Sequence, residues 1–180
     1  MKLIILECDG VIGRKPVADI KNPDDWQPLS ASIKAMGRLC QSAYRLVLIA
    51  SQPKGDQGIE MLQAIYKRLG QSLEQYGGHI DALFFCSHEV KESSECGKSE
   101  TGPYAEIEKR FQCNLLDVPV ISSSLENIDA LKSTGAIPVV IKSADEKNSL
   151  SDMDSVLLKR VQIYKNLAEF SEAIIMGTEE

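Results

Sequence analysis

The stretch that decides the fold is KLIILECDGVI, residues 2–12. It opens with a run of Leu and Ile, which is typical of a buried β-strand. Two acidic residues, Glu7 and Asp9, follow at the end of that run, and Gly10 comes next. Ligands of parallel α/β sheets bind just outside the carboxyl ends of the strands. The residues after each predicted strand are therefore the candidate site residues.

Apolar runs alternate with helical patterns along the rest of the chain. The sequence predicts strands at residues 2–8, 45–50, 80–86, 118–121 and 137–141, with a sixth short strand at 161–164. It predicts helices at 30–42, 60–76, 103–111, 125–133 and 167–176, and polar loops at 87–102 and 143–154. Strands separated by such helices need crossover connections. We therefore expect an α/β fold with a mostly parallel sheet and helices on both faces.

Composition narrows the class of protein. The chain has 180 residues, with 20 Lys and Arg against 26 Asp and Glu, a formal net charge of −6. An acidic chain without a basic run is a poor candidate for binding nucleic acid or an anionic membrane. Its apolar runs are too short to span a bilayer or to form a signal-peptide core. Five cysteines, an odd number, predict reduced thiols and a cytoplasmic location.

Polar residues also follow the other predicted strands, and four strand ends together resemble the haloacid dehalogenase (HAD) superfamily of phosphatases. The similarity is to the branch that contains heptose-1,7-bisphosphate and histidinol-phosphate phosphatases. It covers nearly the whole chain through MKLIILECDGVI (1–12), DALFFCSHEVKESSEC (81–96) and VPVISSSLENIDA (118–130). The resemblance implies a three-layer Rossmann-like fold, a single domain over 1–180 without a large cap domain, and a zinc-loop-like insertion at about 86–102.

The resemblance also implies roles for individual residues. In the family, one aspartate attacks phosphorus and binds Mg²⁺, and a second aspartate is the general acid and base. Glu7 stands at the first position and Asp9 at the second, while Lys98 matches the lysine that neutralises the phosphoryl group. We therefore name Glu7, Asp9 and Lys98 as candidate catalytic residues. The candidate phosphate-binding residues are Ser51, Lys98 and Ser123.

Several positions depart from the family's pattern. Glu7 is one methylene longer than aspartate, and a displacement of about 1 Å can lower a catalytic rate roughly a hundredfold. Ser123 and Asn127 stand where the family has metal-binding acids, and Ala50 stands where it has a phosphoryl-binding hydroxyl. Magnesium requires hard oxygen ligands and gives up its water reluctantly. We therefore expect no bound magnesium.

The zinc loop of the branch is also altered. Its ligands are Cys-x-His followed by Cys-x-Cys. Here Cys86, His88 and Cys96 match three of them, and Ser94 stands at the remaining one. A closed structural zinc site has four ligands, which a water or a nearby glutamate would have to complete. Zinc is thus a candidate cofactor, and a metal-free loop is the alternative.

Three functional hypotheses follow. In the leading one, the altered site belongs to a catalytically impaired pseudophosphatase that works by binding a protein partner or within an assembly. The second is a weak or re-specialised phosphatase for a sugar bisphosphate or histidinol phosphate. The third is a sensor that binds a phosphorylated small molecule without hydrolysing it. We expect Trp26 to anchor the core, and Cys8, Cys40 and Cys113 to be buried, inert thiols.

Overall fold

The computed structural model describes residues 2–14, 16–51, 58–86, 102–124, 131, 134–142 and 161–177. In these residues it has a six-stranded sheet of order β3-β2-β1-β4-β5-β6, and every neighbouring pair of strands is parallel. The predicted parallel α/β architecture is confirmed. The strands are β1 (Leu3–Glu7), β2 (Arg45–Ser51), β3 (Ala82–Cys86), β4 (Pro119–Ser122), β5 (Ile137–Ile141) and β6 (Gln162–Tyr164).

Helices lie close to the predicted ranges. They are α1 (Ser30–Gln41), α2 (Gly58–Glu74), α4 (Gly102–Phe111) and α7 (Leu167–Met176), with short 3-10 helices η1 (Val17–Asp19) and η2 (Pro23–Asp25). None of the helices that the structure describes is long and apolar enough to cross a bilayer. The predicted helix at 125–133 lies outside the described residues except for Leu131. Nearly all of both predicted loops, 87–102 and 143–154, lies outside them as well.

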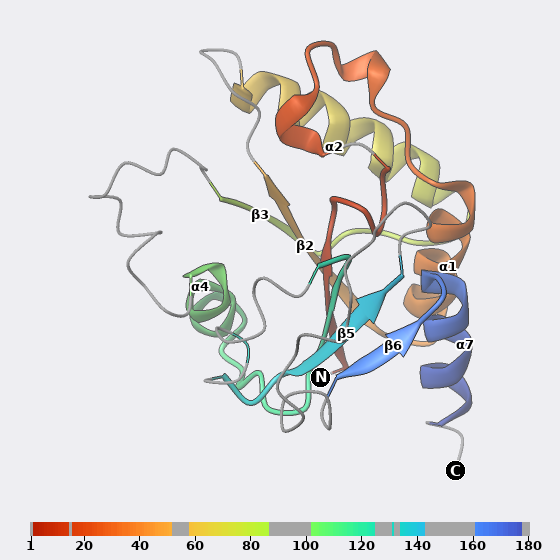
Figure 1. Ribbon diagram of the computed structural model, residues 1–180, viewed down its shortest axis with the longest axis vertical. Coiled ribbons are helices and arrows are strands. Elements are labelled where there is room, and N and C mark those ends of the chain that lie inside the picture. Colours follow the sequence, from red (N-terminus) through yellow and green to blue (C-terminus); the bar gives the residue numbers. More distant parts are fainter. Residues whose placement is uncertain are drawn as a thin grey trace.

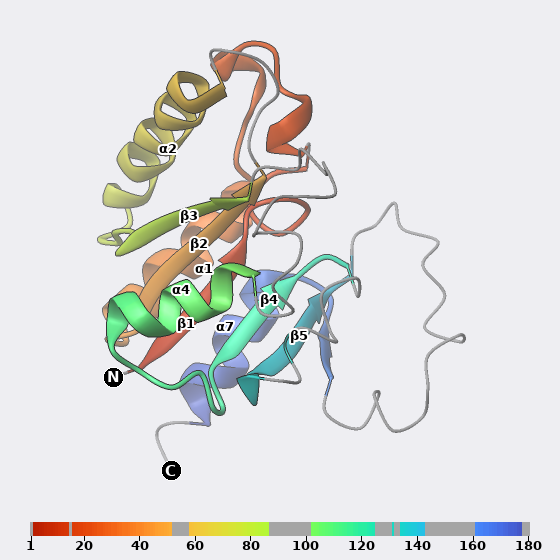
Figure 2. The ribbon, with the colours of Figure 1, turned by 90° about the vertical axis from the view of Figure 1, so that its left-hand side faces the viewer.

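The sheet is covered on both faces, with α4 on one and α1, α2 and α7 on the other (Figures 1 and 2). Alternate residues of β1 pack into two separate cores, since Ile4 and Leu6 face the α1 side while Leu3 and Ile5 face the α4 side. This explains why the β1 run has no polar residue before its end. On the α1 side Trp26 is 2% exposed and packs over Gly13, so its predicted anchoring role is confirmed.

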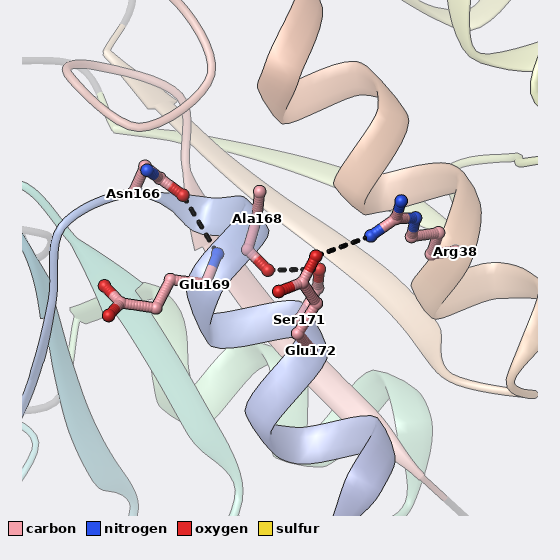
Figure 3. Close-up of polar contacts among 6 residues, drawn as sticks. All are labelled: Arg38, Asn166, Ala168, Glu169, Ser171 and Glu172. Carbon is pink, nitrogen blue, oxygen red and sulfur yellow. Dashed lines mark hydrogen bonds and ion pairs between the residues drawn. The ribbon is translucent and has the colours of Figure 1, made fainter.

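Helices α1 and α7 pack against each other and are linked at their surface by an ion pair (Figure 3). Arg38 of α1 forms an ion pair of 2.9 Å with Glu172 of α7. The α7 helix begins after Asn166, whose side-chain oxygen accepts a 2.9 Å hydrogen bond from the main-chain N–H of Glu169. An N-cap bond satisfies a donor that the helix itself leaves unpaired.

Removing this cap is expected to destabilise the protein measurably. We expect Asn166→Ala to lower the free energy of unfolding by about 1 kcal/mol, the usual cost of losing an N-cap side chain. The matched change Glu172→Gln removes an ion pair whose side chains are more than half exposed. That loss should stay below about 0.5 kcal/mol because solvent screens exposed pairs. Urea denaturation compares the two, and equal losses would contradict the assigned role of Asn166.

Candidate active site

The site is built where β1 ends between its two neighbours. Glu7 is the last residue of β1 and pairs with Ile49 of β2, while the register of β1 against β4 places Leu6 beside Ile121. Parallel strands bring their carboxyl ends to the same edge of the sheet. The ends of β2 and β4, which are Ser51 and Ser122, therefore flank the end of β1.

After β1 the chain makes a tight loop that turns Asp9 back toward β2. Gly10 adopts a positive φ of 75°, and the N–H groups of Ile12 and Gly13 both donate to the carbonyl oxygen of Cys8 at 3.1 Å. A Cβ atom at Gly10 would lie 2.5 Å from Cβ of Ser123. Glycine is thus required here both for its backbone conformation and for the close approach of the β4 end.

The Asp9 carboxylate is held on both of its oxygens. Oδ1 accepts a 2.8 Å hydrogen bond from the N–H of Val17, and Oδ2 accepts a 2.5 Å hydrogen bond from the Ser51 hydroxyl. Oγ of Ser51 itself accepts a 3.2 Å hydrogen bond from the N–H of Ala18. The single hydroxyl proton of Ser51 is therefore directed at Asp9 in this structure. Its predicted contact with a phosphoryl group stays a prediction.

The Glu7 carboxylate is held from the opposite side of β1. The Ser122 hydroxyl donates a 2.5 Å hydrogen bond to Oε2 of Glu7, and Oγ of Ser122 accepts from the N–H of Ser124 at 3.0 Å. Ser122 is 4% exposed. Sequence reasoning did not single out this residue, because three consecutive serines carry no signal of which one faces β1.

Ser123 points at the loop instead of at Glu7. Its hydroxyl donates a 2.9 Å hydrogen bond to the carbonyl oxygen of Asp9. The edge thus presents three kinds of hard oxygen donor: the Glu7 carboxylate, the Asp9 carbonyl and the Ser123 hydroxyl. Among the described residues, no group of three or more His, Cys, Asp or Glu side chains could hold a metal ion.

The thiol beside the two carboxylates is buried. Cys8 is 4% exposed, and burial strongly raises the pKa of its thiol, with smaller contributions from the charges of Asp9 and Glu7. Its predicted burial is confirmed, and because a thiol is nucleophilic as the thiolate, the raised pKa disfavours the reactive form. The prediction that Cys40 and Cys113 are buried is wrong, because both are only partly buried, although burial also raises the pKa of each.

The other predicted site residues lie outside the described part of the chain. They are Lys98, His88 and Cys96, together with the side chain of Cys86, and Asn127, which stands where the family has a metal-binding acid, lies outside as well. Zinc binding and the role of Lys98 therefore stay predictions.

No family model matches this chain, but several proteins similar to it over nearly its whole length are named as phosphatases. A D-glycero-β-D-manno-heptose-1,7-bisphosphate 7-phosphatase of Bordetella bronchiseptica is 31% identical over 178 residues, 97% of this chain and 98% of the relative. The crystal structure of the D,D-heptose 1,7-bisphosphate phosphatase from B. bronchiseptica, complexed with magnesium and phosphate, superposes with a TM-score of 0.85 at 30% identity. That match covers 98% of this chain and 99% of the solved one.

These comparisons correct the leading hypothesis from the sequence. The prediction of a catalytically impaired pseudophosphatase is wrong, because relatives matched over nearly the whole chain are named as phosphatases. Ser51 was predicted to bind phosphate, and Ser122 was not singled out from the sequence. The fold places both hydroxyls on the two carboxylates. The expectation of no magnesium also finds no support, since a solved relative holds that ion together with phosphate.

A more distant likeness establishes the fold. A HAD-superfamily hydrolase from Ehrlichia chaffeensis superposes with a TM-score of 0.57 at 13% identity, covering 89% of this chain and 63% of that one. The match to the Bordetella enzyme establishes more than the fold, because the two sequences are also 31% identical over nearly their full lengths. The chain shares its fold with that HAD-superfamily hydrolase, and it belongs to the family of D-glycero-β-D-manno-heptose-1,7-bisphosphate 7-phosphatases.

Proposed function

We propose that this chain is a HAD-type phosphomonoesterase that acts on a sugar phosphate, with heptose 1,7-bisphosphate as the first candidate. The observation that carries the proposal is the pair of carboxylates at the end of β1. Glu7 and Asp9 are held separately, by Ser122 of β4 and Ser51 of β2. Such fixed geometry is what phosphoryl transfer needs, because its catalysis depends on positioning and electrostatic stabilisation. The names of the full-length relatives support the substrate class.

In the proposed reaction, a carboxylate oxygen of Glu7 attacks phosphorus while the bond from phosphorus to the sugar oxygen breaks. Asp9 in its acid form gives its proton to that sugar oxygen, so the products are a free sugar hydroxyl and an acyl phosphate on Glu7. Water then attacks phosphorus, Asp9 takes a proton from it, and the bond between phosphorus and Glu7 breaks. Inorganic phosphate leaves, and both carboxyl groups return to their starting state.

The oxygen donors at this edge fit magnesium, provided that the substrate supplies part of its shell. Magnesium is commonly held by one or two carboxylates together with phosphate oxygens and water. In this proposal Glu7 is the carboxylate ligand, and the Asp9 carbonyl and the Ser123 hydroxyl are further oxygens nearby. When bound, the ion offsets the negative charge of the phosphoryl oxygens.

Three further assignments belong to the proposal as predictions from the sequence. Lys98 neutralises the transferring phosphoryl group, and Ser51 and Ser123 line its site. Cys86, His88 and Cys96 bind zinc with a fourth ligand that the sequence does not identify. The third assignment is that the chain binds a protein partner.

The direct test is hydrolysis of a panel of phosphate esters by the purified chain with magnesium. The panel contains heptose 1,7-bisphosphate, hexose monophosphates, hexose bisphosphates and histidinol phosphate. We expect one sugar phosphate to be hydrolysed at about 1–10 s⁻¹, a normal enzymatic rate. Following the reaction by ³¹P NMR identifies which phosphate group is lost, and a chelator should abolish turnover. Phosphate release below about 0.01 s⁻¹ for every ester, roughly two to three orders of magnitude under that rate, would overturn the proposal.

A further inference from the structure

We propose that Ser122 is a positioning residue, which fixes the carboxylate of Glu7 for attack on phosphorus. This inference rests on the proposed function, because it assigns the role of a side chain toward the nucleophile of that reaction. It arises from one contact, the 2.5 Å hydrogen bond from Ser122 Oγ to Oε2 of Glu7.

The direction of this hydrogen bond is set by the backbone. A serine hydroxyl has one proton and two acceptor lone pairs. Oγ of Ser122 accepts a 3.0 Å hydrogen bond from the N–H of Ser124, so the hydroxyl proton is left to point at Glu7. Ser122 is 4% exposed, which keeps water from replacing either bond readily. The hydroxyl therefore holds the plane of the carboxylate, and with it the direction of the second oxygen, Oε1.

Glu7 has a particular need for such a contact. A glutamate side chain has three rotatable bonds and loses considerable rotamer freedom when it is held in one geometry. The attack on phosphorus tolerates little displacement, since about 1 Å can change the rate roughly a hundredfold. Ser122 removes this freedom before the substrate arrives, which is the usual benefit of preorganisation.

The contact is not needed to hold the sheet together. The strands it joins already pair through their backbones, with Ile5 beside Val120 and Leu6 beside Ile121. The buried side chains of these strands add apolar packing on both faces. Loss of the Ser122 hydroxyl should therefore lower the reaction rate far more than the stability of the fold.

The first part of the test measures kinetics. We expect Ser122→Ala to lower kcat and kcat/KM together by about 10- to 100-fold, with KM unchanged within about threefold. Ser122→Thr keeps a hydroxyl and should recover most of the rate. The control is Ser171→Ala, which removes another buried serine hydroxyl, one that donates to Ala168 within α7 (Figure 3). This control should leave both constants unchanged.

A double-mutant cycle separates positioning from a general structural effect. Glu7→Asp shortens the side chain by one methylene, so that the carboxylate withdraws from Ser122. In that background Ser122→Ala should change kcat by less than about twofold, whereas it has its full effect beside the native glutamate. Equal effects in the two backgrounds would overturn the inference.

The second part does not need turnover. Beryllofluoride mimics a phosphoryl group on a carboxylate, and its adduct is visible by ¹⁹F NMR. With magnesium present, we expect an adduct in the unmodified protein and in Ser171→Ala, weakened at least about tenfold in Ser122→Ala. If the unmodified protein forms the adduct and Ser122→Ala weakens it, but no ester is hydrolysed, the proposed function fails while the positioning of the Glu7 carboxylate by Ser122 is still supported. If Ser122→Ala binds beryllofluoride as well as Ser171→Ala does, or if the unmodified protein forms no adduct, the inference is overturned.

Discussion

Replacing Glu7 with glutamine is expected to lower phosphatase turnover by about a thousandfold or more. Glutamine has nearly the same size and keeps an oxygen that can accept from Ser122, so the fold and the 2.5 Å contact need not change. It is not a nucleophile at phosphorus, and it lacks the charge that a magnesium ion requires. The measurement is the initial rate of phosphate release under saturating substrate.

The matched control is Glu172→Gln, which neutralises a glutamate that lies on α7 and pairs with Arg38. Its rate should equal that of the unmodified protein. Rapid acid quenching should also reveal a phosphorylated peptide that contains Glu7 in the unmodified protein, and this peptide should be absent from Glu7→Gln. Turnover by Glu7→Gln within tenfold of the native rate would remove Glu7 from the reaction.

The substitution Gly10→Ala is expected to lower the free energy of unfolding by roughly 2–4 kcal/mol. It strains the backbone, and its new Cβ atom overlaps with a neighbouring side chain. The φ of Gly10 is 75°, a conformation that alanine adopts with strain, and the added Cβ would lie 2.5 Å from Cβ of Ser123. Relief of the overlap must move the end of β4 or the loop that carries Asp9. We therefore expect phosphatase activity to fall as well.

Gly70→Ala is the control, and it is expected to change stability in the opposite direction. Gly70 lies inside α2, and a Cβ atom there would meet no other group within 4 Å. Alanine should stabilise the helix by roughly 0.5–1 kcal/mol because glycine is a poor helix former. Urea denaturation of both variants gives changes of opposite sign. A Gly10→Ala protein as stable as the native one would show that the loop does not need glycine.

The fold was predictable because its strands and helices carry strong local signals. The apolar run before Glu7 has the composition of a strand buried on both faces, and it is buried on both faces in the sheet. The sequence predicts that the second long helix ends at residue 76, and α2 stops slightly earlier, at Glu74, before Gly77 with its positive φ of 68°. Helix ends are uncertain by a few residues because the last turn frays.

The candidate site was predictable only in part. That Glu7 and Asp9 lie at the carboxyl edge of the sheet follows from topology alone. The choice among the three serines at the end of β4 does not, because it depends on the register in which Leu6 lies beside Ile121. A shift of one residue would turn a different hydroxyl toward Glu7. The contact between Ser51 and Asp9 was not predicted either. β2 continues one residue beyond the predicted strand, so that Ser51 is its last residue and lies beside Asp9.

The hydrogen bond between Ser122 and Glu7 joins positions that are 115 residues apart in the chain. During synthesis the amino-terminal segment, with both acidic groups, is made long before β4 exists. Closing so long a loop costs entropy and makes such contacts slow to form. A growing polypeptide can thus complete β1, β2 and β3 without an organised reaction centre, and the capacity for chemistry arises only when β4 adds to the other side of β1.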